Sequence, residues 1–120
     1  MMFISEERRF EFEIPDEWWS AAGMSGFTPR RPAYRASAHP TLATRVLAID
    51  QIRPFRDAPG VTDFNRDRML GVLNAIRRHQ ALPPIEVDRF THRLHDGLHR
   101  FHASIAVGFA HVPAAIGSFI

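Results

Sequence analysis

The sequence has 120 residues, the size of one small domain, and 45% of them are hydrophobic, which is enough for a packed core and too many for a disordered tail. It contains no cysteine, which excludes disulfides, thiolate metal sites and a catalytic thiol. The formal net charge is +2, but residues 1–20 carry six acids and two arginines, whereas residues 21–120 carry thirteen arginines and seven acids. The basic part favours anionic ligands, and the near balance of charges argues only weakly for DNA binding.

The N-terminal extension, residues 1–43, is predicted to hold a strand, a short helix and an irregular arm. Residues 10–14 alternate apolar and charged side chains, which is the period of a half-buried strand. Asp16 is expected to cap a short helix over residues 17–22. Residues 27–41 contain three prolines and several small residues, which predicts an arm wrapped over the core.

Residues 44–120 are predicted to form the main domain, with the element order strand, helix, strand, strand, helix, strand. The predicted strands are a buried one over residues 45–49 and further ones over 85–90, 93–95 and 112–116. The first helix is capped by Asn65 or Asp63 and has an apolar stripe, and the second begins at Asp96-Gly97 and ends at Gly108. The expected fold class is α+β (mixed α/β), with one mixed sheet and packed helices.

The most informative stretch is Asp96-Gly97-Leu98-His99-Arg100-Phe101-His102-Ala103, which we call the Gly-x-x-Arg box. It lies between a predicted strand and a predicted helix. Glycine allows a sharp turn, the free amides of the helix start attract anions, and Arg100 adds donors suited to phosphate oxygens. As a bare pattern the box is weak, because a capped helix with a solvated arginine has the same sequence.

The order of several landmarks from Thr44 to Ile120 resembles the ParB N-terminal-like and sulfiredoxin-like superfamily. The landmarks are the strand and Arg-Pro exit of residues 46–54, the helix of 69–77, the Pro-Ile-x-Val strand of 84–87, the Gly-x-x-Arg box, and the closing segment of 108–114. The resemblance covers about two thirds of the chain, so the expected fold is that of a stand-alone domain of this superfamily.

The resemblance implies that the box binds nucleotide phosphates. The expected ligand is a nucleotide, CTP or ATP with or without Mg²⁺, or a phosphorylated small molecule. Carried over by position, the site residues are Gly97, Leu98, His99 and Arg100, with further positive charge from Arg53 and Arg68. Leu98 stands where sulfiredoxins have their cysteine, so thiol-based sulfinic repair is excluded. Gly71 and Ala75 replace hydroxyl residues that help sulfiredoxins hold ATP, which weakens the case for ATP.

Two other classes of function stay open. In a nucleotide hydrolase or small-molecule phosphotransferase, Asp96 is the candidate general base, although an acid at this position is more often a helix cap. In a protein-interaction module with a degenerate site, the adjacent Trp18 and Trp19 are candidate contacts, with one of them in the core. A partner protein is therefore a further expectation.

Partners of three other kinds are not expected. The chain has no helix-turn-helix after the box, so sequence-specific DNA binding by this chain alone is not expected. A metal site formed by His95, His99 and His102 is a weak alternative, because no carboxylate in the helix completes a ligand set. Glu86 and Asp88 are expected on a solvated strand face.

No apolar run reaches the roughly 20 residues of a membrane span, and the N-terminus differs from a signal peptide, so we expect a soluble cytoplasmic protein.

Overall fold

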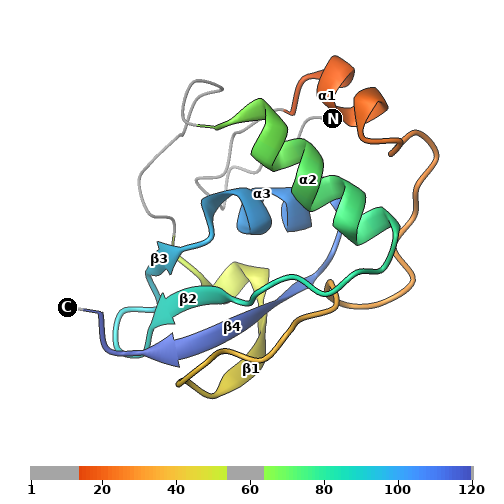
Figure 1. Cartoon of the computed structure of the whole chain (residues 1–120). Helices are drawn as coiled ribbons and strands as arrows, with labels where there is room; N and C mark the ends of the chain where they lie inside the picture. Colours follow the sequence, from red (N-terminus) through yellow and green to blue (C-terminus); the bar gives the residue numbers. More distant parts are fainter. Residues whose placement is uncertain (1–13, 54–63, 120) are drawn as a thin grey trace.

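The computed structural model describes residues 14–53 and 64–119 (Figure 1). The elements in chain order are α1 (Asp16–Ala21), β1 (Thr44–Ala48), the 3-10 turn η1 (Ile49–Gln51), α2 (Arg66–Arg77), β2 (Ile85–Asp88), β3 (Leu94–Asp96), α3 (Leu98–Val107) and β4 (His111–Gly117). Residues 10–13 of the predicted first strand and the predicted loop after Arg53 lie outside the described residues. In the described part of the chain, no helix is long and apolar enough to cross a membrane.

The four strands form one mixed sheet in the order β1-β4-β2-β3. The last strand, β4, lies between β1, to which it is antiparallel, and β2, to which it is parallel. The remaining pair, β2 and β3, is antiparallel. The predicted fold class is therefore confirmed: this is a small α+β domain with one four-stranded mixed sheet.

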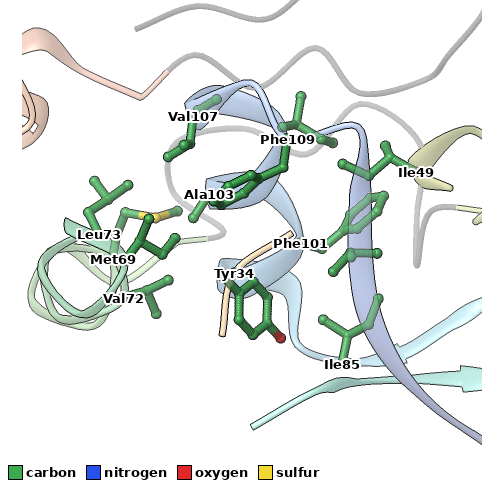
Figure 2. Packing of buried hydrophobic residues seen from close by; sticks show 14 of the residues in the cluster. Tyr34, Ile49, Met69, Val72, Leu73, Ile85, Phe101, Ala103, Val107 and Phe109 are labelled. Carbon is green, nitrogen blue, oxygen red and sulfur yellow. The ribbon is translucent and has the colours of Figure 1, made fainter. Parts of the chain in front are cut away.

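Helix α3 lies between the sheet and α2 (Figure 1). Every residue from Phe101 to Val107 is buried, because the sheet covers one side of α3 and α2 covers the other. The predicted apolar stripe of α2 supplies Met69, Val72 and Leu73, which pack near Ala103 and Val107 (Figure 2). The helical spacing of apolar residues thus placed both helices correctly.

The prediction that the first strand of the main domain is buried was wrong. Thr44, Arg45 and Val46 are exposed, and Val46 keeps 57% of its surface. In the order β1-β4-β2-β3, β1 is an edge strand that pairs with β4 alone. A short apolar run therefore predicted a strand correctly, but its burial depended on the strand order.

The second strand ends two residues earlier than predicted, at Asp88 rather than residue 90. The Asp88 carboxylate Oδ2 accepts hydrogen bonds from the backbone nitrogens of Phe90 and Thr91, at 3.0 and 2.8 Å, and thereby folds the chain into a turn. Asp88 is only 4% exposed, so the expectation of a solvated acidic face was wrong at this position. Local side-chain bonding of this kind replaced the last part of the predicted strand.

Of the three predicted helix caps, one is confirmed. The Asn65 Oδ1 accepts from the Arg68 backbone nitrogen at 2.9 Å and caps α2. Asp16 is instead the first residue of α1, with Pro15 at the N-cap position. Asp96 ends β3, and Gly97 occupies the N-cap of α3. Each aspartate therefore lies one residue away from its predicted place.

The segment after α1 forms an irregular arm, residues 24–43, that lies over the core. Among the described residues, the only β-bridge of this arm is an isolated parallel one between Ala36 and Leu82. Tyr34 is buried, and its hydroxyl donates to the Pro83 carbonyl at 2.6 Å. His39 Nε2 lies 3.0 Å from Glu86 Oε2 on β2. These contacts attach the arm to the first half of β2 and to the residues directly before it.

Truncating the buried face of α2 should reduce stability much more than truncating its flank. Leu73 is 0% exposed, so Leu73→Ala is expected to lower the free energy of unfolding by about 2–5 kcal/mol through lost burial and a cavity. Leu70→Ala is the matched control on the same helix, because Leu70 is only partly buried and should lose less. Urea unfolding of both variants measures this, and equal losses would contradict the packing described above.

Candidate functional site

The Gly-x-x-Arg box begins at a glycine that the backbone requires. Gly97 has φ +106°, in the left-handed region, and a Cβ built there would lie 2.7 Å from Ile85 Cγ2 and 3.2 Å from Ile85 Cα. The chain therefore passes close against β2 as it turns from β3 into α3. No side chain caps α3, so its first amide groups have no partner within the helix and lie at the positive end of its dipole.

The guanidinium of Arg100 holds two backbone carbonyls. Its Nη1 donates to the Pro83 and Pro84 carbonyl oxygens at 2.9 and 2.7 Å. Its Nη2 lies 3.5 Å from Asp96 Oδ2, one helical turn away, and the Arg100 side chain is 16% exposed. The predicted phosphate ligand is thus also a structural residue, which joins α3 to the start of β2.

The Pro83 carbonyl is shared with the arm, since it also accepts from the Tyr34 hydroxyl. Burial raises the pKa of the Tyr34 phenol well above its usual value, against the opposing effect of Arg100. The phenol therefore stays protonated and remains a donor. The sequence reasoning missed this network. The signal for this network in the sequence is the Pro83-Pro84 pair, because prolines have no amide donors and their carbonyls therefore need partners from elsewhere.

His99 connects the start of α3 to the start of α2. Its Nε2 accepts from the Asn65 backbone nitrogen at 2.9 Å, so in the neutral ring the proton lies on Nδ1. Burial, followed by the nearby charges of Arg68 and Arg100, lowers the pKa of His99 below its usual range. His99 therefore lies near both Arg68 and Arg100.

The other two histidines of the weak metal alternative each contact an aromatic ring. His102 is 3% exposed, and burial, helped by His99, lowers its pKa to about 4. Its ring meets the edge of Phe64 at 5.3 Å between centroids. His95 instead stacks on Phe119, with centroids 4.2 Å apart. Within residues 14–53 and 64–119, no three His, Cys, Asp or Glu residues form a group that could hold a metal ion.

The remaining predicted site residues differ in how exposed they are. Arg53 is exposed, and its backbone is hydrogen-bonded to His92 and Leu94 at the start of β3. Arg68 is exposed in the first turn of α2. The Asp96 side chain is 66% exposed beside Arg100. Leu98 is partly buried against the core.

The comparisons with known proteins support the fold. No family model and no curated protein sequence matches this chain. The crystal structure of sulfiredoxin from Arabidopsis thaliana is similar, with a TM-score of 0.51 and 18% sequence identity, covering 64% of this chain and 86% of that chain. The chain therefore has a sulfiredoxin-like fold, as its landmarks indicated, and this likeness alone reaches no further than the fold.

Two glycines at the ends of α3 allow the requirement for Gly97 to be tested. Gly108→Ala places a side chain at φ +100°, with Pro29 Cγ at an ordinary 3.9 Å, and should cost about 1–3 kcal/mol of stability from backbone strain alone. Gly97→Ala adds the contact with Ile85 and should cost about 1–3 kcal/mol more. Denaturant unfolding of both variants measures the difference, and a smaller loss for Gly97→Ala would refute the close approach.

The buried imidazole of His102 predicts a pH dependence of stability. The folded pKa of about 4 lies below the unfolded value of 6.5, so the unfolded state binds the extra proton. Stability is full above pH 6.5 and falls as pH drops from 6.5 to 4, by on the order of 3 kcal/mol from this residue. Unfolding curves at pH 7, 5.5 and 4 measure the fall. His102→Gln should flatten the slope, and an unchanged slope would show that another group carries it.

Proposed function

We propose that this chain binds the phosphate groups of a nucleotide where the first turns of α2 and α3 meet. The observation that carries the proposal is the hydrogen bond from the Asn65 backbone to His99 Nε2, which joins the two helix starts. The positive ends of two helix dipoles therefore lie side by side, and phosphate binds favourably at such ends.

The surrounding side chains fit an anion. Burial is the larger cause of the lowered pKa of His99, and the charges of exposed Arg68 and of Arg100 within α3 lower it further. These two cations beside His99 favour a ligand with negative charge. Arg68 is the cation free to turn toward a ligand, whereas Arg100 contributes charge from a fixed position on the Pro83 and Pro84 carbonyls.

The start of α3 has no capping side chain. Its first amides have no partner within the helix, so no side chain competes with a phosphate oxygen there. In the sulfiredoxin-like fold, this turn lies between β3 and α3. Titration distinguishes CTP from ATP as the nucleotide and shows whether Mg²⁺ is required.

Calorimetric titration with CTP, ATP and GTP, with and without Mg²⁺, tests the proposal. We expect at least one nucleotide to bind, and Arg68→Ala to weaken that binding about tenfold through loss of a charged contact. Arg45→Ala is the matched control, because Arg45 is an exposed arginine on the edge strand β1. Arg100→Ala should also weaken binding, but it needs a parallel unfolding curve because it removes bonds that hold the fold.

The titration has two outcomes that would reject the proposal. In one, the wild-type protein binds none of the three nucleotides. In the other, a nucleotide binds, but Arg68→Ala and a folded Arg100→Ala variant both bind as well as the Arg45→Ala control. Either result would favour the alternative of a protein-interaction module, in which the box serves the fold alone.

A further inference from the structure

A pocket of about 560 Å³ lies between the arm and the C-terminal end of α2. It is lined by residues 26–31 and 33–35 of the arm, by residues 76–80 apart from Arg78, and by Phe109 after α3. In Figure 1 the arm descends beside the end of α2, whereas β3 and the start of α3 lie on the other side of the molecule. The pocket and the Gly-x-x-Arg box are therefore separate places in the fold.

The lining of this pocket is strongly basic. Four guanidinium groups, from Arg30, Arg31, Arg35 and Arg77, line it together with the imidazole of His79. No described lining residue is acidic, and the ion pairs within residues 14–53 and 64–119 include neither Arg30 nor Arg31. Four like charges around one cavity repel one another, so an anionic ligand would relieve an existing cost.

Attraction to the end of α2 accounts for only two of these four arginines. Cations at the C-terminal end of a helix are favourable, and this explains Arg77, which also donates to the Ala22 carbonyl at 3.1 Å. Arg35 binds the same helix end through the His79 carbonyl at 3.3 Å. Arg30 and Arg31 are exposed on the arm and make no such contact, so their positive charge is not used by the fold.

The rest of the lining is largely apolar, with Thr28 and Gln80 as neutral polar residues. Phe27, Ile76 and Phe109 line the cavity with the ring of Tyr34, whose hydroxyl is already bonded to Pro83. Aromatic faces and arginines together suit a planar ring that carries an anionic group.

We propose that this pocket binds a small molecule that joins a phosphate monoester to an aromatic ring, such as a nucleoside monophosphate. A phosphate monoester carries about two negative charges at neutral pH, which matches four arginines better than a single carboxylate does. The volume is within the roughly 300–1,000 Å³ of small-molecule sites. The site is independent of the proposed function, because it shares no residue with the box.

The test uses AMP as the probe, with adenosine as the uncharged control. Titrations of the wild-type protein are followed by calorimetry and by two-dimensional NMR of the backbone amides. We expect AMP to bind, adenosine to bind at least about tenfold more weakly, and the shifted signals to belong to residues 27–35 and 76–80. Signals of residues 97–100 should not move at AMP concentrations that saturate the pocket.

Variants separate this pocket from the box. The double variant Arg30→Ala/Arg31→Ala should weaken AMP binding about tenfold or more, and Arg68→Ala and Arg45→Ala should leave it unchanged. The double variant should keep the wild-type unfolding midpoint, since neither arginine has a described partner. If it does not fold, the NMR mapping on the wild-type protein decides alone.

Three results would overturn the proposal: no AMP binding by the wild type, equal binding of adenosine, or AMP shifts confined to the box. The proposed function fails on different grounds, namely nucleotide binding that does not depend on Arg68 or Arg100. A protein with only one of the two sites would therefore be identified as such by these variants.

Discussion

The guanidinium of Arg100 joins three segments that are far apart in the sequence. One nitrogen, Nη1, binds the Pro83 and Pro84 carbonyls at 2.9 and 2.7 Å, and the Pro83 carbonyl also accepts from Tyr34 of the arm. The start of β2, the first turn of α3 and the arm are thus held at one point. Because an unpaired buried carbonyl is costly, loss of Arg100 would affect the sheet, the helix and the arm together. The position of the box relative to the sheet depends on this contact.

This role changes how the Gly-x-x-Arg pattern is interpreted. The glycine and the arginine both serve the fold, Gly97 because a Cβ there would lie 2.7 Å from Ile85 Cγ2, and Arg100 because it donates to the Pro83 and Pro84 carbonyls. The pattern alone therefore does not separate a ligand site from a structural turn. What favours a site is the region around it: the starts of α2 and α3 adjoin through His99, and Arg68 is exposed beside them. Neither feature is required to hold the strand–helix turn.

Much of the fold was predictable from the sequence, and the errors have a common physical cause. Helical spacing of apolar residues and the Asn65 cap are local signals, so both long helices were predicted within a few residues. The burial of β1 was predicted wrongly because it depends on strand order, which is a property of the whole sheet. The buried Asp88, whose four hydrogen bonds lower its pKa to about 2, was missed because one donor, Phe119, is distant in sequence. The arm arginines were missed because nothing local connects them with the end of α2.

The two proposed sites use opposite ends of the same helix, and this sets what each needs. At the start of α2 the dipole, with the first amides that the Asn65 cap leaves unbonded, favours an anion. At its end the dipole opposes an anion, so the positive charge must come from side chains. The helix itself supplies Arg77, while Arg30, Arg31 and Arg35 come from the arm. The pocket is therefore a property of the arm as it is held by Tyr34, and its exposed Arg30 and Arg31 can change without altering the box. A chain that kept the sulfiredoxin-like core and Tyr34 but replaced these two arginines would retain the first site and lose the second.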